Sequence, residues 1–251
     1  MASVETLGST DIICSDKTGT ITQNKMIVKS IYINDKLYTE KDNIPNNEML
    51  NYCASSCHNV VKNNDNYIGD ETEVAIYKYL EQTNHLNKFT RIKEYPFDSD
   101  RKMMSTLNEI NNQKYSFTKG SLDSVINKCT YYLKDNELYM MSPEYREEIF
   151  KIEKEQSTKS LRLLAFAYKN KDIDTPEEDM IFIGLIGMMD PPRETVNNAI
   201  FTCHKAGLKP IMITGDSINT AIAIAKDVNI IDSPDKAIEG KYIDKMTDEE
   251  L

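Results

Sequence analysis

The sequence predicts an α/β protein in which an α+β domain is inserted into a domain built on a parallel sheet. Two observations lead to this prediction. Strand patterns and helix patterns alternate near both ends of the 251-residue chain, as they do in parallel sheets. The middle of the chain instead shows short alternating apolar and polar runs separated by turn residues, which are typical of antiparallel strands.

The two ends of the chain carry the parallel part. Runs of β-branched and other apolar residues predict buried strands over residues 10–14, 181–186 and 209–213. Apolar residues at helical spacing predict helices over residues 194–206 and 218–228. The order strand, helix, strand, helix favours parallel, Rossmann-like units.

The middle begins with a hairpin and two helices. Residues 27–38 are expected to form the hairpin, which turns at Asn34-Asp35. The apolar pattern predicts helices over residues 48–58 and 72–82. This hairpin and these helices do not follow the regular strand–helix order of the two ends, which indicates that they belong to a separate domain.

Antiparallel strands are expected to follow over residues 91–95, 103–109 and 114–118, with a turn at Asn111-Asn112. Pro143 begins a charged helix that runs to about residue 156, since proline suits an early helical position. We therefore expect one domain over residues 26–189, inserted between the two parts of the other, residues 1–25 and 190–251.

The composition excludes some classes of function. A formal net charge of −10 argues against a protein that binds nucleic acid or an anionic membrane surface. Five cysteines, an odd number at irregular spacings, indicate a reducing compartment. Cys53, Cys57 and His58 suggest a metal site, but zinc normally needs further ligands at matching spacing, and only His85 and His204 remain as histidines.

No transmembrane span is expected. The longest apolar stretch, Met180–Met189, has ten residues and is bounded by Asp179 and Asp190. A spanning helix needs about 20 apolar residues. We therefore predict that this stretch is a buried strand.

A candidate nucleophile follows the first predicted strand. Asp16 lies directly behind the apolar run Ile12-Ile13-Cys14, and the loop continues as Lys17-Thr18-Gly19-Thr20. Ligands of open α/β folds bind at the carboxyl edge of the sheet. A carboxylate there, followed by a cation, two hydroxyls and a glycine that lets backbone amides approach an anion, suits attack on a phosphoryl group.

Five more strings accompany this loop in order along the chain. They are Gly69-Asp70-Glu71-Thr72-Glu73, Phe97-Asp98-Ser99-Asp100-Arg101-Lys102, Lys119-Gly120-Ser121, Asp190-Pro191-Pro192-Arg193 and Thr214-Gly215-Asp216. In sequence, order and rough spacing the chain resembles the P-type cation-transporting ATPases. The resemblance implies a haloacid-dehalogenase-like phosphorylation domain, incomplete at its C-terminal side here, and an inserted nucleotide-binding domain built on an antiparallel sheet.

The resemblance also implies roles at the phosphorylation loop. Asp16 is the residue that accepts the γ-phosphoryl group of ATP, and Thr214 donates to the phosphoryl oxygens. Mg²⁺ is implied as a cofactor, with the Asp16 carboxylate and the Thr18 carbonyl as its protein ligands. The remaining members of the implied catalytic set are Lys17, Gly215 and Asp216.

Thr18 distinguishes a pump from a phosphatase. Related phosphatases carry a second Asp two residues after the nucleophile, which acts as general acid and base. Threonine cannot move a proton in this way near neutral pH. An acyl phosphate beside Thr18 is therefore expected to live longer, as a transporter requires. A capped haloacid-dehalogenase-like phosphatase remains the less favoured alternative.

ATP is not expected to lie on a P-loop, since the sequence has no Gly-x4-Gly-Lys-Ser/Thr string. An aromatic platform with lysines is the other physical solution. Phe97 is a candidate for stacking on adenine, and Glu73 for contacting its amino group. By resemblance, the nucleotide site is lined by Thr72, Glu73, Phe97, Lys102, Lys119, Arg162 and Leu164, with Asp190 and Arg193 at the return crossing.

The chain departs from the family pattern in three places. Ser99 stands where some calcium pumps carry Arg, and the usual Lys-Gly-Ala-Pro-Glu string is Lys119-Gly120-Ser121-Leu122-Asp123, so phosphate contacts are expected to be fewer. A phosphate-contacting Lys and a Gly-Asp-Gly-x-Asn-Asp string do not occur before Leu251. We therefore expect the chain to be an excerpt that binds nucleotide and forms little or no phosphoenzyme. An isolated nucleotide-binding module is the main alternative.

The strings around Phe97 and Asp190 look most like those of type II calcium pumps, so Ca²⁺ is the expected transported ion, although sodium/potassium and related pumps share much of both strings. The ligands of that ion are implied to lie in membrane helices that this chain lacks. The whole protein is then expected to be a multi-pass cell-membrane protein with this segment on the cytoplasmic side. The chain itself is expected to be a monomer that binds ATP and no nucleic acid.

Overall fold

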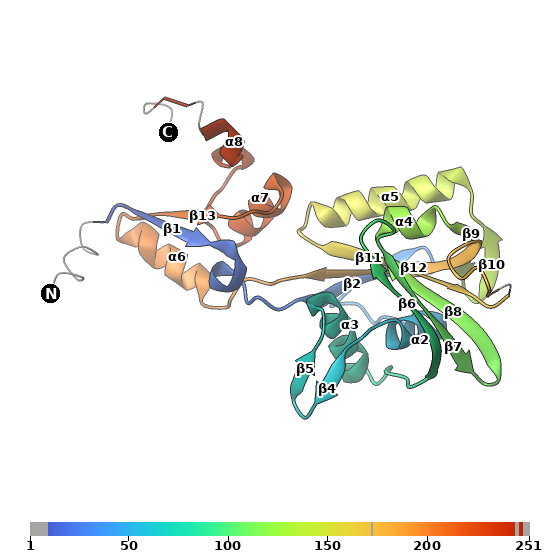
Figure 1. Cartoon of the computed structure of the whole chain (residues 1–251). Helices are drawn as coiled ribbons and strands as arrows, with labels where there is room; N and C mark the ends of the chain where they lie inside the picture. The colour runs from blue at the N-terminus through green and yellow to red at the C-terminus, as the bar shows by residue number, and fades with distance from the viewer. Residues whose placement is uncertain (1–9, 172, 244–245, 248–251) are drawn as a thin grey trace. The chain divides into compact units, whose positions relative to one another are not determined.

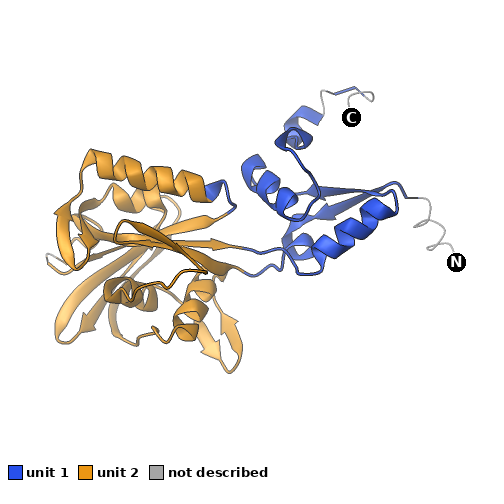
Figure 2. Cartoon of the chain, turned by 180° about the vertical axis from the view of Figure 1, so that it is seen from behind, with its two compact units in different colours: residues 1–25, 157–160, 190–251 blue, residues 26–156, 161–189 orange. Residues whose placement is uncertain are grey.

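A computed structural model describes residues 10–171, 173–243 and 246–247 of the chain. The described residues fall into two compact units, which Figure 2 shows in different colours. Unit 1 takes in residues 1–25, 157–160 and 190–251, and unit 2 takes in residues 26–156 and 161–189. The chain therefore enters unit 2 at residue 26, passes briefly through unit 1 at residues 157–160, and returns to unit 1 after residue 189.

Within the described part of the chain, unit 2 is built on a nine-stranded sheet. Its central path runs in the order β10-β9-β12-β11-β8-β7-β6, with β2 paired to β12 and β3 paired to β2. Neighbouring strands are antiparallel except for β12 and β9, which are parallel. The strands are β2 (Ile27–Ile33), β3 (Lys36–Thr39), β6 (Thr90–Asp98), β7 (Met103–Ile110), β8 (Gln113–Gly120), β9 (Cys129–Lys134), β10 (Glu137–Met140), β11 (Arg162–Lys169) and β12 (Met180–Met189).

Helices cover both faces of this sheet (Figure 1). On one face lie α2 (Glu48–Ser56) and α3 (Glu71–Gln82), and on the other lie α4 (Leu122–Ile126) and α5 (Pro143–Ser157). Each face has its own apolar core, because alternate side chains of a strand point to opposite faces. A small hairpin, β4 (Val61–Asn63) and β5 (Asn66–Ile68), joins α2 to α3.

The predicted hairpins are confirmed at their turns. Asn34 and Asp35 have φ angles of 52° and 58°, and Asn111 and Asn112 have φ angles of 51° and 61°. Asparagine and aspartate tolerate this left-handed region better than other non-glycine residues. The predicted helices correspond to α2, α3 and α5, and the prediction of a buried strand over residues 180–189 is confirmed by β12.

Unit 1 contains a short parallel sheet and three described α-helices. Strand β1 (Ile12–Asp16) pairs in parallel with β13 (Lys209–Ile213). The other elements are a one-turn segment η1 (Lys17–Ile21), α6 (Val196–Lys205), α7 (Ile218–Asp227), the short turn η2 (Pro234–Lys236) and α8 (Gly240–Ile243). Its core gathers Ile21, Val196, Ile200, Ile224 and Val228.

Two details of the sequence prediction are wrong. The strand over residues 181–186 does not join the parallel sheet, since β12 belongs to the sheet of unit 2. The strands β1 and β13 are also not buried, and Ile213 is 58% exposed. The reason is that only two strands make up this sheet among the described residues, so one face of each apolar run is left uncovered.

Among the described residues, none of the helices is long and apolar enough to span a bilayer.

Candidate functional site

The first candidate site lies at the carboxyl edge of the parallel sheet in unit 1. Asp16 is the last residue of β1 and pairs with Ile213, the last residue of β13. Asp16 and Thr214 therefore stand at the same edge, as the sequence predicted from the rule for open α/β sheets. Gly19 has a φ angle of +76°, which suits glycine and lets the chain turn directly after Asp16.

An ion pair joins the two loops at this edge. The Lys17 ammonium lies 2.7 Å from Asp216 Oδ2, with side chains 11% and 33% exposed. The backbone N–H of Asp216 donates to Thr214 Oγ1 at 3.1 Å. Lys17 thus binds a carboxylate of the neighbouring loop, while the Asp16 side chain next to it is exposed.

Asp190 and Arg193 make their contacts inside unit 1. Both Asp190 oxygens accept hydrogen bonds, Oδ2 from Thr22 Oγ1 at 2.6 Å and Oδ1 from the Lys25 N–H at 3.0 Å. Arg193 Nη2 donates to the Gly19 carbonyl at 2.6 Å. These bonds tie the two crossing segments together and fix the loop that follows Asp16.

The residues expected to hold Mg²⁺ fit the ion's chemistry. In the part of the chain that is described, no three His, Cys, Asp or Glu side chains gather into a metal-binding group. A Mg²⁺ ion that accompanies a nucleotide needs fewer protein ligands, because it keeps several waters and takes one or two carboxylates together with the phosphates. The exposed Asp16 carboxylate and the nearby Thr18 carbonyl are oxygen ligands of this kind.

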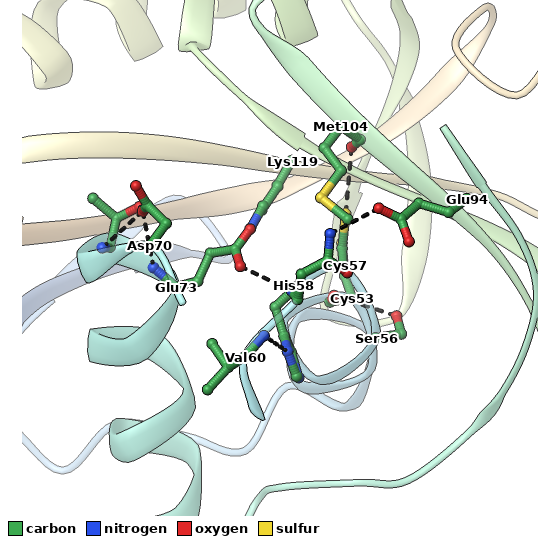
Figure 3. Close-up of polar contacts among 12 residues, drawn as sticks. Cys53, Ser56, Cys57, His58, Val60, Asp70, Glu73, Glu94, Met104 and Lys119 are labelled. Atoms are coloured by element: carbon green, nitrogen blue, oxygen red, sulfur yellow. Dashed lines mark hydrogen bonds and ion pairs between the residues drawn. The ribbon is translucent and has the colours of Figure 1, made fainter. Parts of the chain in front are cut away.

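The second candidate site lies in unit 2 and centres on Glu73 and Lys119 (Figure 3). The Lys119 ammonium lies 2.5 Å from Glu73 Oε1, and the other oxygen of Glu73 accepts the Asn59 N–H at 2.8 Å. Asp70 caps α3 by accepting the Thr72 N–H at 2.9 Å, which places Thr72 and Glu73 in the first turn. A helix N-terminus and a buried lysine therefore meet at one place.

Phe97 lies near the end of β6, and Lys102 lies on the loop between β6 and β7. The pairing of these strands shifts between Tyr95 and Asp98, so that Pro96 and Phe97 together lie opposite Met104. This bulge leaves the Phe97 ring 64% exposed. Met104 pairs on its other side with Lys119, so the exposed ring and the lysine belong to neighbouring parts of the sheet.

The backbone of Lys102 closes the loop. Lys102 has a φ angle of +54°, its N–H donates to Asp98 O at 2.7 Å, and its carbonyl accepts the Ser121 N–H at 3.0 Å. A Cβ atom on Gly120 would lie 2.5 Å from that carbonyl. Only glycine therefore lets the end of β8 approach the loop this closely.

Arg162 and Leu164 lie on β11, which pairs with β8 next to Lys119. Burial alone would raise the pKa of Asp70 at the start of α3, but hydrogen bonds from Thr72 and Glu73, helped by the charge of the exposed Arg162, lower it. Leu164 is partly buried against the core that α2 and α3 cover. The structure thus places the predicted nucleotide residues of unit 2 on α3, β8, β11, the end of β6 and the loop that follows it.

The Cys53, Cys57 and His58 group is structural in its contacts. The Cys53 thiol lies 3.5 Å from Thr118 O and the Cys57 thiol 3.3 Å from Met104 O, and both cysteines are buried. Burial raises the pKa of the Cys57 thiol to about 11. Burial also lowers the pKa of His58 to about 4, and its Nδ1 accepts the Val60 N–H at 3.0 Å.

A cavity of about 340 Å³ lies elsewhere in unit 2, and its lining includes His58, Tyr77, Arg91 and Asn108. None of the predicted nucleotide residues lines it.

Sequence reasoning gave no role to three residues that shape the second site. Asn59 binds Glu73 through its backbone, which no side-chain pattern reveals. Arg101 lies inside a recognised string and donates to Glu177, which comes from the loop before β12. The sequence shows that Glu177 is acidic, but it does not show that Glu177 pairs with Arg101, which is 76 positions away.

Comparisons with known proteins find a matching family model and several similar proteins. A family model described as "P-type ATPase, cytoplasmic domain N" matches residues 43–195. Over its whole length the chain is 41% identical to "Calcium-transporting ATPase 1" of Bacillus cereus and 39% identical to "Calcium-transporting ATPase 1" of Lactococcus lactis. It is 33% identical to "Calcium-transporting ATPase 1" of Saccharomyces cerevisiae. The chain spans 30% of the length of each of these relatives.

Proposed function

Because this chain belongs to the P-type ATPases, we propose that it is the ATP-binding and aspartyl-phosphate-forming cytosolic portion of a membrane cation pump. In this proposal unit 2 is the nucleotide-binding domain and unit 1 is part of the phosphorylation domain. The chain itself binds ATP as a monomer. The transported cation is bound by membrane helices of a longer protein.

The observation that carries the nucleotide proposal is the exposed Phe97 ring on the β6 bulge, which lies before the Lys102 loop and is separated by β7 from Lys119 on β8. A ring that is 64% exposed on a bulge has lost most of the benefit of burial, and it offers a face on which adenine can stack. Lys119 and Glu73 provide a donor and an acceptor for the polar edge of the base. Lys102 and Arg162 supply positive charge for the phosphates.

The phosphoryl proposal rests on Asp16. Its carboxylate is exposed at a sheet edge and is the nucleophile that attacks the γ-phosphorus, forming a bond from Oδ to phosphorus as ADP leaves. Thr214 donates to the phosphoryl oxygens, and Arg193 and Lys17 hold the loop that carries Asp16. When bound, Mg²⁺ neutralises charge on the transferred group, with the Asp16 carboxylate and the Thr18 carbonyl as its protein ligands.

The ion proposal rests on the relatives. Three proteins with 33–41% identity across the chain carry the words "calcium-transporting" in their names, and we propose Ca²⁺ for this one. A pump of this kind lies in the cell membrane, with the present segment on the cytoplasmic side.

Titration of the 251-residue chain with ATP tests the nucleotide proposal. We expect Phe97→Ala to weaken ATP binding about tenfold, since one stacked base contributes about 1–3 kcal/mol. The matched control is Phe201→Ala, which removes a ring of similar exposure, 60%, in unit 1 and should leave the affinity unchanged. Equal affinities for the two variants would contradict the proposed site.

Phosphoryl transfer is tested separately with γ-labelled ATP and Mg²⁺. A longer protein that carries this chain should incorporate label, and hydroxylamine should release it. The Asp16→Asn variant of that protein should incorporate none. The 251-residue chain alone should incorporate little, because its sequence contains no Gly-Asp-Gly-x-Asn-Asp string. Fast turnover of a simple phosphate ester by the longer protein would instead favour a phosphatase.

A further inference from the structure

Glu177 lies at the centre of a polar network beside the proposed nucleotide site. Its Oε1 accepts a hydrogen bond from Arg101 Nη1 and another from Ser105 Oγ at 2.8 Å. Ser105 is fully buried on β7. Because the single Ser105 proton goes to Glu177, Thr118 on β8 donates to Ser105 Oγ at 2.8 Å. One carboxylate thus joins the loop after β6 to the middle of the sheet.

The second bond of Arg101 reaches the bulge. Arg101 Nη2 donates to the Pro96 carbonyl at 2.7 Å, and Pro96 directly precedes Phe97. Proline has no N–H to donate to a neighbouring strand, so a bulge that contains it has few backbone bonds to fix its shape. The guanidinium supplies one of the bonds that hold this bulge, and Glu177 holds the guanidinium.

The loop that carries Glu177 is itself held. Lys169, a buried residue at the end of β11, donates from its ammonium to the Thr175 carbonyl at 3.0 Å. The Glu178 N–H donates to the same carbonyl at 3.4 Å. Glu177 therefore comes from a fixed segment, and its carboxylate can serve as an anchor for a more exposed loop.

We propose that Glu177 is a positioning residue for nucleotide binding: through Arg101 it fixes the Pro96-Phe97 bulge so that the Phe97 ring is held ready to stack. This inference rests on the proposed function of unit 2. A mobile Phe97 ring would lose conformational entropy when ATP binds. A bulge whose shape is already fixed removes much of that entropy cost.

The main test compares Glu177→Gln with Glu178→Gln, an exposed neighbour on the same loop. Glutamine keeps an oxygen for Ser105 but loses the charge that holds Arg101. We expect Glu177→Gln to weaken binding of ATP about fivefold, since hydrogen bonds to charged groups are stronger than neutral ones. Glu178→Gln should leave it unchanged. The binding of adenosine should weaken by the same factor as the binding of ATP, because the lost contact is to the base.

Two further measurements separate positioning from a general effect on folding. In a Phe97→Ala background, Glu177→Gln should cause no additional loss of affinity. Arg101→Lys keeps a positive charge near Glu177 but cannot also bind the Pro96 carbonyl in the same way. This variant should weaken the binding of ATP and of adenosine by the same factor. It replaces Glu177→Gln as the test if Glu177→Gln does not fold.

Several results would overturn the inference. One is a Glu177→Gln variant whose affinity for ATP is unchanged while its unfolding midpoint is lowered. Another is a loss of affinity from Glu177→Gln that is equally large in the Phe97→Ala background. A third is an Arg101→Lys variant that binds ATP more weakly but adenosine as before. A chain that binds no ATP at all would overturn the proposed function, and with it this inference. Binding that Glu177→Gln leaves untouched would overturn this inference alone.

Discussion

The Lys119 ammonium lies 2.5 Å from Glu73 Oε1, and the two side chains are only 9% and 12% exposed. The partners come from β8 and α3, so the ion pair fastens a helix to the sheet that it covers. Water is largely excluded from both charges. Breaking such a pair by removing one partner leaves the other charge buried without compensation.

Lys119→Met should therefore destabilise unit 2 strongly. We expect a loss of about 3 kcal/mol in the free energy of unfolding, the typical cost of leaving one partner of a buried pair alone. The chain has no tryptophan, so urea unfolding at neutral pH is best followed by far-ultraviolet circular dichroism.

The matched control is Lys29→Met. Lys29 pairs with Glu40 at 2.6 Å, but the Glu40 side chain is 53% exposed. Exposed pairs contribute about 0–1 kcal/mol, so this change should be nearly neutral. The double variant Glu73→Gln with Lys119→Met should lose less than the sum of its two single changes. Similar losses of unfolding free energy for Lys119→Met and Lys29→Met would show that the buried ion pair does not hold α3 to the sheet.

His58 should make stability depend on pH. Burial lowers its pKa to about 4 in the folded protein, against about 6.5 in an unfolded chain. Above pH ~6.5 the histidine is neutral in both states and contributes nothing to the pH dependence. As the pH falls from about 6.5 towards 4, the unfolded state binds the proton first, so stability is lost by up to about 3 kcal/mol.

His58→Asn isolates this contribution, since its side-chain oxygen can still accept the Val60 N–H. Other groups titrate over the same range, so the quantity to follow is the difference in unfolding free energy between the original chain and the variant. That difference should be constant near neutral pH and should shift in favour of the variant as the solution is acidified. A constant difference down to pH ~4.5 would contradict the depressed pKa.

The sequence predicted those parts of the fold that depend on local chemistry. The turns at Asn34-Asp35 and Asn111-Asn112 were predictable because these residue types accept positive φ. The same signal at Asn64 and at Asp135-Asn136 marks the turns of the β4–β5 and β9–β10 hairpins, which the prediction missed because their strands are short or exposed. The partners of β12 could not be predicted, since pairing in a sheet depends on distant parts of the chain.

The same limit applies to the sites. Asp16 and Thr214 were expected at one sheet edge from a general rule about parallel strands, and they lie there. The contact between Glu73 and Lys119 joins positions 46 residues apart, and that between Arg101 and Glu177 joins positions 76 apart. Spacing along the sequence carries no information about such pairs, because only the packing of α3 and of the loop before β12 onto the sheet brings them together.

Gly120→Ala should disturb the loop that carries Lys102. An added Cβ would lie 2.5 Å from the Lys102 carbonyl and 2.9 Å from Met103 Cα, and backbone atoms cannot move aside cheaply. We expect a loss of at least about 2 kcal/mol in the free energy of unfolding and weaker ATP binding. The control is Gly240→Ala, where nothing lies within 4 Å of the new atom. A neutral Gly120→Ala would mean that the end of β8 does not press on this loop.

Lys17 and Asp16 should differ sharply in what they contribute to stability, although they are neighbours. Lys17 is 11% exposed and is paired with Asp216 across the sheet edge, whereas the Asp16 side chain is exposed. Lys17→Met should lower the stability of unit 1 by about 1–2 kcal/mol, less than for a fully buried pair because Asp216 remains partly hydrated. Asp16→Asn should change it by less than about 0.5 kcal/mol.

Hydrogen exchange of the β1 and β13 amides measures this in unit 1 alone. Exchange should speed up in Lys17→Met and remain as in the original chain in Asp16→Asn. The reason is that Lys17 holds the loop after β1 to the loop after β13 through Asp216, whereas the Asp16 side chain is exposed. Equal protection in the two variants would mean that the ion pair does not hold this edge together.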